Sequence, residues 1–211
     1  LPEVPVAYRC IHTNPTCAPA RDGAAEGACT RAAISYDAAM HPSLRHTAHR
    51  PWPLPQAPWI WRQAWLDLGF LHFRMRPADL ADRIPAGLRL ETFDDTAWIS
   101  VVPFRMADVM RRPLPSFPPF SSFPELNLRT YVTDGRKPGV WFFSLDADCR
   151  PIVWGGRHVY QLPYHHARMR QRKTEHGFDF TSARRAAEVR FEASWAGEGP
   201  VFEARPGSFE H

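Results

Sequence analysis

Apolar and polar side chains alternate most regularly along residues 123–132, which read FPELNLRTYV. Because successive side chains of a strand point to opposite faces, this alternation predicts a β-strand with one apolar and one polar face. The polar face would carry Glu125, Asn127, Arg129 and Tyr131. The turn sequence TDGRKPG and a second apolar segment at residues 140–145 follow, so we expect the two strands to pair as a hairpin.

Further strands are expected on either side of this hairpin. Residues 88–93 and 97–104 flank an acidic turn, and residues 189–195 alternate again. A short helix is expected around Pro77, which suits the first helical turn. Since strands outnumber helices and successive strands look hairpin-linked, the predicted fold is α+β, with a mainly antiparallel, strongly curved sheet and few short helices.

Residues 155–166, GGRHVYQLPYHH, concentrate charged and ring-bearing side chains directly after residues 152–154, which resemble a core strand. A guanidinium suits a carboxylate, tyrosine hydroxyls can donate to an oxyanion, and histidine exchanges protons near neutral pH. The candidate groups here are Arg157, Tyr160, Tyr164 and His165. An ordinary strand-to-helix turn with a polar surface gives the same pattern, and we expect residues 165–173 to form that helix.

The polar strand face also allows two interpretations. A face exposed to water shows this pattern, and so does the inner wall of a ligand pocket. In a pocket, Glu125 would serve as a base, and Asn127 and Arg129 would contact the ligand. Buried charges require compensation, so Glu125 and Arg129 would then be expected to neutralise each other.

Composition narrows the classes of function. The chain has 211 residues, and its hydrophobic content of 44% allows a sizeable core in one domain. The net charge of +4 comes almost entirely from arginine, because Lys137 and Lys173 are the only lysines. Arg168, Arg170 and Arg172 fall on no single face of the expected helix, so a nucleic-acid partner is not expected.

Membrane and metal-binding classes are not expected either. No apolar run approaches the roughly 20 residues that span a bilayer, and no signal peptide is recognisable, so we expect a cytoplasmic location without membrane contact. The cysteines form no C-x-x-C pair and match no zinc spacing. We therefore expect no bound metal, and nothing in the sequence indicates a cofactor.

The ends of the chain differ from its centre. Residues 1–39 show no sustained periodicity, and the pattern changes at Met40, the first methionine. We expect residues 1–39 to be a disordered or mistranslated upstream extension, and residues 40–211 to form a single domain. The sequence stops in mid-pattern at His211, so a C-terminal truncation is also expected.

Five blocks in order resemble the YqjF-like family of uncharacterised bacterial proteins, over residues 48–211. They are HRPWPLPQAPWIWRQAW, IPAGLRLETFDDTAWISVVPF, FPELNLRTYV, KPGVWFFSLDAD and RHVYQLPYHHARM. The resemblance implies a single YqjF-like domain that continues past residue 211. It also implies a distant relationship to acetoacetate decarboxylase, and hence a sheet folded into a cone or barrel around a pocket.

The resemblance bears on chemistry as well. Decarboxylases of that group carry a Schiff-base lysine in a block of the form G-R-E, aromatic-G-aromatic-P-K-K. At the positions that match the two lysines this chain has Tyr164 and His165, neither of which can form an imine. Schiff-base decarboxylation is therefore not expected. The resemblance also makes Glu125 the match of a glutamate in that site.

Three functions remain open, and the sequence does not decide whether the protein is an enzyme. The first is a lysine-free enzyme for a small oxo- or hydroxy-carboxylic acid. Arg157 would hold the carboxylate and Glu125 would be the base, with Tyr160 or Tyr164 as the acid. The second is a non-catalytic binding protein for a small acidic or apolar ligand. The third is an interaction module, in which the loop at residues 113–124 packs on a partner, with a homo-oligomer as one form.

Overall fold

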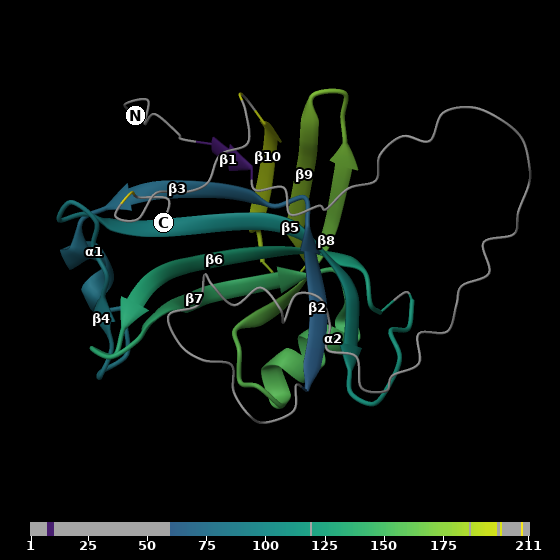
Figure 1. Cartoon of the computed structure of the whole chain (residues 1–211), viewed down its shortest axis with the longest axis horizontal. Helices are drawn as coiled ribbons and strands as arrows, with labels where there is room; N and C mark the ends of the chain where they lie inside the picture. Colours follow the sequence, from purple (N-terminus) through teal and green to yellow (C-terminus); the bar gives the residue numbers. More distant parts are fainter. Residues whose placement is uncertain are drawn as a thin grey trace, which may run out of the picture.

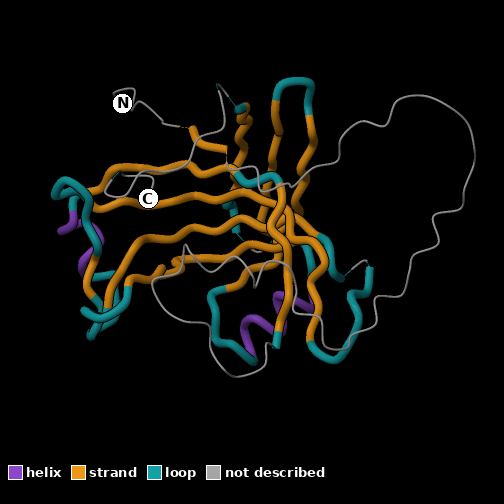
Figure 2. The backbone as a smooth tube through the Cα atoms, viewed as in Figure 1, coloured by secondary structure: helices purple, strands orange, loops and turns teal. Residues whose placement is uncertain are grey.

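Strands form nearly all the regular structure of the computed structural model, which describes residues 8–10, 60–118, 120–185, 187–197, 199 and 208. Figure 2 shows long strands together with short helical segments. In chain order the elements are β1 (Tyr8–Cys10), β2 (Trp61–Leu66), β3 (Gly69–Met75), α1 (Pro77–Ala81), β4 (Arg89–Leu90), β5 (Ala97–Arg111), β6 (Phe123–Thr133), β7 (Pro138–Ala147), α2 (Arg150–His158), β8 (Tyr164–Lys173), β9 (Gly177–Arg184) and β10 (Arg190–Ala196).

The strands build one sheet in the order β1-β3-β5-β6-β7-β8-β9-β10, with β2 also paired to β5 and β4 to β6. In Figure 1, strands β3, β5, β6 and β7 run across the view, and β8, β9 and β10 rise steeply from them. The predicted predominance of strands over helices is confirmed. Of residues 1–39 only β1 is described, and the expectation for the rest of that segment lies outside the described residues.

The sheet is mixed and open, which corrects the expected architecture. β7 and β8 run parallel through three residue pairs, whereas the other pairs of described strands are antiparallel. A parallel pair needs a crossover connection, and α2 supplies it here. The expected cone or barrel is wrong, because the sheet is neither closed nor strongly curled (Figure 1).

Several local predictions are confirmed. β6 and β7 form the expected antiparallel hairpin, with a register shift between Leu128 and Arg129. The acidic turn has Asp94 and Asp95 at φ of 49° and 56°. Two consecutive residues with positive φ match the twist of a two-residue turn, and aspartate tolerates that conformation better than most residues. The hairpin expected across this turn is wrong, because the strand before it is reduced to β4, which pairs with β6 rather than with β5. Pro77 begins α1, as its fixed φ favours.

Two elements have the opposite type from the one expected. Residues 152–154 belong to helix α2, whose first turn contains Pro151, because a short apolar run fits a helix face as well as a buried strand. Residues 165–173 lie in strand β8, which pairs with β9 along its length. Ala167 and Met169 are buried in β8 and alternate with exposed arginines, so pairing overrides the helix propensity of arginine and glutamine.

Separate hydrophobic cores lie against the two faces of the sheet. One contains Phe104 of β5, Phe123 of β6 and Val153 of α2. The other gathers Leu126 of β6 with the buried side of strands β8 to β10. Glu125 and Leu126 are neighbours on β6, so they point to opposite faces. The candidate polar residues on β6 therefore share their face with the first core.

Gly156 lets helix α2 approach strand β8. A Cβ on Gly156 would lie 2.8 Å from Cε2 of Tyr164 and closer still to Cδ2, whereas a Cβ on Gly155 would meet nothing within 4 Å. We expect Gly156→Ala to lower the free energy of unfolding by about 1 to 3 kcal/mol, because the ring or the helix must move. Gly155→Ala is the control, and should raise the free energy of unfolding by up to about 1 kcal/mol, because alanine has the higher helix propensity. Urea unfolding of both variants checks this, and equal effects would contradict the close packing.

Candidate functional site

Glu125 lies at the centre of the candidate site and is only 1% exposed. Phe104 of β5 and Ala147 of β7 are its direct partners in the sheet, so all three side chains share one face. Burial raises the Glu125 pKa to about 7, and interactions with Tyr164 and Asn127 offset part of that rise. This carboxyl group therefore changes its charge near neutral pH.

The Tyr164 hydroxyl contacts the carboxyl group of Glu125. Its oxygen is 3.3 Å from both Oε1 and Oε2, and the two side chains come from strands β8 and β6. Tyr164 pairs with Leu145 of β7, and Leu145 pairs with Asn127 of β6. Since directly paired residues share a sheet face, Tyr164 lies on the same face as Asn127 and Glu125. Burial and the nearby Glu125 raise the pKa of Tyr164, so the phenol keeps its proton and acts as a donor.

Arg129 lies four residues along β6 from Glu125, and the structure does not pair the two. Among the described residues, neither side chain forms an ion pair. The expected mutual neutralisation is therefore wrong. The Arg129 guanidinium instead lies over aromatic rings, with Cζ 5.5 Å from the centroid of Phe70 and 6.0 Å from that of Tyr131. Such contacts stabilise a cation in part.

Two further polar residues from other strands flank Arg129. Ser100 of β5 is the direct sheet partner of both Arg129 and His72, and it is fully buried. His72 of β3 has its Nε2 2.8 Å from the hydroxyl of Tyr131. Burial and the charge of Arg129 lower the His72 pKa to about 4, so this imidazole is neutral at pH 7.

The remaining candidates lie elsewhere. Arg157 is exposed on α2. Tyr160 is half-exposed, and its hydroxyl accepts a hydrogen bond from the indole of Trp61. His165 pairs with Asp146 on the sheet face opposite to Tyr164, where burial and Arg184 lower its pKa. The structure thus brings Glu125, Asn127, Arg129 and Tyr164 to one face, and leaves the other three outside it.

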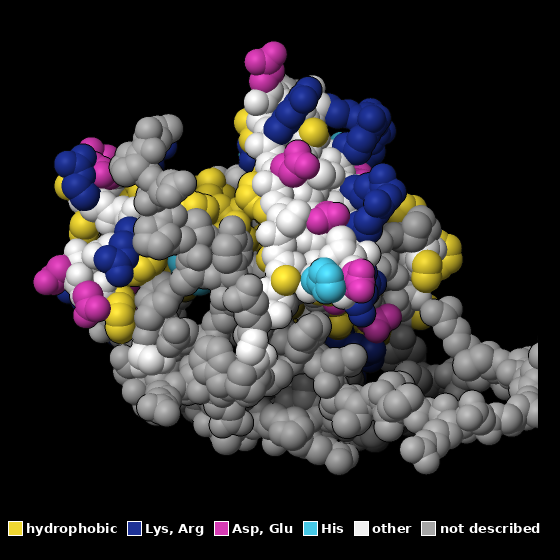
Figure 3. Space-filling model, turned by 90° about the horizontal axis from the view of Figure 1, so that it is seen from above, with side chains coloured by type: hydrophobic (Ala, Val, Ile, Leu, Met, Phe, Trp, Pro, Cys, Tyr) yellow, Lys and Arg dark blue, Asp and Glu magenta, His cyan; other side chains and the backbone are white. Residues whose placement is uncertain are grey.

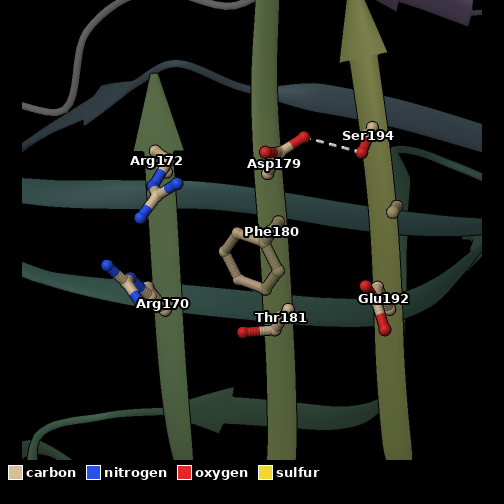
Figure 4. A pocket seen from close by; sticks show the side chains of 8 residues that line it. Arg170, Arg172, Asp179, Phe180, Thr181, Glu192 and Ser194 are labelled. Atoms are coloured by element: carbon tan, nitrogen blue, oxygen red, sulfur yellow. Dashed lines mark hydrogen bonds between the residues drawn. The ribbon is translucent and has the colours of Figure 1, made fainter. Parts of the chain in front are cut away.

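An open depression on the outer face of β8, β9 and β10 is a separate feature (Figure 4). Its lining residues are Arg170, Arg172, Asp179, Phe180, Thr181, Glu192, Ala193 and Ser194. Because β8 is a strand, Arg168, Arg170 and Arg172 do share one face, contrary to the expectation for a helix. Asp179 on β9 and Glu192 on β10 interrupt this positive charge. Figure 3 likewise shows acidic side chains lying among lysine and arginine side chains on the face in view. The absence of a nucleic-acid partner stays a prediction.

Clusters of metal ligands and helices long enough to span a membrane are both absent from the part of the chain that the structure describes. Within it, no three His, Cys, Asp or Glu side chains gather closely enough to hold a metal ion. The two described helices are too short to cross a bilayer. The apolar loop expected to meet a partner exposes Leu114 and Phe117 to solvent. Whether a partner covers them stays a prediction.

The sequence profile of DUF2071, described as an uncharacterized conserved protein, matches residues 62–211. The chain belongs to the DUF2071 family. A DUF2071 relative, the uncharacterized protein YqjF of Bacillus subtilis (strain 168), is 40% identical over 159 residues. These make up 75% of this chain and 66% of YqjF, so the chain spans slightly less than two thirds of that relative. The predicted YqjF-like membership is confirmed.

Two solved structures of low sequence identity are similar to this chain. The enduracididine biosynthesis enzyme MppR with HEPES buffer bound has a TM-score of 0.53 and 16% sequence identity, over 71% of this chain and 59% of MppR. Acetoacetate decarboxylase from Legionella pneumophila has a TM-score of 0.46 and 15% identity, over 74% of this chain and 58% of the enzyme. The likeness to MppR concerns the fold alone.

Proposed function

We propose that this DUF2071 domain transfers protons on a small oxo- or hydroxy-carboxylic acid through Glu125 and Tyr164. The observation that carries the proposal is the buried Glu125, whose pKa of about 7 leaves it partly ionised at neutral pH. A general base works best when its pKa lies near the working pH. Tyr164, in contact with both carboxyl oxygens, supplies a neutral donor beside that base.

Proton transfer next to a carbonyl group uses these two side chains in complementary ways. The ionised Glu125 takes a proton from the carbon beside the carbonyl, the C–H bond breaks, and its electron pair forms an enolate. The Tyr164 hydroxyl then turns from Glu125 to donate a hydrogen bond to the enolate oxygen. Its 3.3 Å contacts with Glu125 are long for O–H···O bonds, so little is lost in that exchange. Return of the proton from Glu125 to carbon completes the cycle.

A route through a lysine imine finds no support in the described residues. Lys137 follows strand β6 in the hairpin turn, and Lys173 ends β8, and both are exposed. A Schiff-base lysine requires a lowered pKa, which burial or a neighbouring cation would provide. We therefore propose chemistry that rests on Glu125 rather than on an amine.

A non-catalytic binding protein is the alternative that one observation favours. Trp65, Phe70 and Tyr164 are partly buried and pack against the core beside Glu125. An apolar and aromatic surrounding with few polar groups is typical of ligand sites, whether or not they catalyse a reaction. In this case Glu125 would only select a ligand, and no proton would be transferred to carbon.

Hydrogen–deuterium exchange distinguishes these functions. Oxo acids of about three to eight carbons, from pyruvate to acids whose carbonyl group is remote from the carboxylate, are incubated with the protein in D2O, and loss of the signal from the hydrogens beside the carbonyl is followed by NMR. We expect Glu125→Gln to slow protein-dependent exchange by about 10²- to 10⁴-fold, which is the usual contribution of a general base. Glu192→Gln removes an exposed carboxyl group on β10 and should exchange like the parent. Binding without exchange in all three proteins would support the binding protein instead.

A further inference from the structure

Arg129 and its neighbours leave several buried polar atoms without hydrogen-bond partners. Among the described residues, Nε of Arg129, Oγ of Ser100 and Oδ1 of Asn127 are all buried and unbonded. Buried polar atoms in folded proteins nearly always have a partner, and an unpaired one costs free energy. Three such atoms on one sheet face therefore indicate a site for a polar ligand.

The three atoms differ in the partner that each requires. Arg129 can only donate, and Ser100 beside it can also donate, so together they suit an anion such as a carboxylate. Asn127 directs its amide toward Glu125, which lowers the Glu125 pKa, so its free oxygen accepts a hydrogen bond from a ligand. Two donors, Arg129 and its β5 partner Ser100, therefore lie beside one acceptor, Asn127, two residues away on β6.

The charge of Arg129 supports the same reading. No described carboxylate forms an ion pair with it, and His72 nearby is neutral at pH 7. The rings of Phe70 and Tyr131 stabilise the cation only in part. A bound carboxylate would supply the missing negative charge and the acceptor for Nε.

We propose that Arg129 and Ser100 bind the carboxylate of an elongated hydroxy acid, whose hydroxyl group donates to Asn127 and whose far end places a carbonyl group beside Glu125. This inference rests on the proposed function for the role of Glu125, and replaces Arg157 with Arg129 as the carboxylate-binding residue. Arg129 lies four residues beyond Glu125, a distance of about 13 Å along β6. With C–C bonds of about 1.5 Å, a three-carbon acid cannot span the two.

Binding measurements by calorimetry test this inference without any requirement for turnover. The probes are straight-chain hydroxy acids of about three to eight carbons, with their primary amides as uncharged analogues. We expect the parent to prefer the longer acids to lactate and to bind each acid more tightly than its amide. Arg129→Met should weaken acid binding by about 10- to 100-fold, the usual contribution of a charged hydrogen bond. Its affinity for the amides should be nearly unchanged.

Matched variants separate a binding role from a structural one. Arg74→Met removes an exposed arginine that also lies over an aromatic ring, with Cζ 5.2 Å from the Trp98 centroid, and should bind acids like the parent. Arg129→Lys keeps the charge and should recover part of the acid preference if Arg129→Met folds poorly. Acid binding is measured without turnover, so a failure of acid binding at Arg129 remains distinguishable from a failure of proton transfer at Glu125. Equal acid affinity in the parent and Arg129→Met, or no binding of any acid, would overturn the proposal.

Discussion

Arg184→Met should lower the free energy of unfolding by about 3 to 5 kcal/mol at pH 7, because it leaves a buried carboxylate without its partner. Asp146 is 3% exposed and accepts three bonds from Arg184, with Nε 3.0 Å and 2.9 Å from its two oxygens and Nη2 2.6 Å from Oδ1. The pair joins β7 to β9 across β8, where the parallel and antiparallel parts of the sheet meet. Urea unfolding measures the loss.

Two controls show whether burial causes this effect. Arg76→Met breaks an ion pair with Asp79 whose side chains are 84% and 37% exposed, and should leave the unfolding free energy unchanged within error. The double variant Asp146→Leu with Arg184→Met removes both buried charges and should recover most of the lost stability. A double variant as unstable as Arg184→Met alone would contradict the explanation.

The unfolding free energy of Glu125→Gln, taken relative to the parent at the same pH, should be about 3 kcal/mol higher at pH 8 than at pH 4. The Glu125 pKa is raised from 4.5 to about 7 by burial, so the folded state favours the protonated carboxyl group. That contribution is fully present below pH 4.5 and is lost as the pH rises toward 7. Glutamine cannot ionise, so the variant does not show this loss.

The comparison must isolate Glu125 from other groups that titrate. His72 has a lowered pKa, and its effect runs the other way, since stability is lost as the pH falls from 6.5 to about 4. It is present in both proteins and cancels in the difference. Glu192→Gln, on the exposed face of β10, should give a difference from the parent that hardly changes with pH. A pH-independent difference for Glu125→Gln would mean that Glu125 is solvated.

Alternation along β6 was sufficient to find the polar face. It grouped Glu125, Asn127 and Arg129 correctly, because the period of two survives in any strand. It could not decide between an exposed face and a buried one, since burial depends on what other strands and α2 place over it. The 1% exposure of Glu125 decides for burial at that position.

The partners of that face could not be predicted from the sequence, because they depend on register between strands. Ser100 joins Arg129 through the β5–β6 register, and His72 joins through β3. Tyr164 was one of two tyrosine candidates, and only the parallel pairing of β8 with β7 selects it over Tyr160. The expected helix at residues 165–173 is incompatible with this pairing. The buried Ala167 and Met169 alternate with exposed arginines, which is the period of a strand.

Titration of the Glu125 carboxyl group by infrared difference spectroscopy tests the central claim most directly, with Glu125→Gln used to assign the signal. We expect the protonated band to disappear with a midpoint near pH 7. Tyr164→Phe removes the hydroxyl that stabilises the carboxylate, so its midpoint should be higher still. A midpoint at or below the ordinary 4.5, unchanged in Tyr164→Phe, would contradict both the buried acid and the proton transfer built on it.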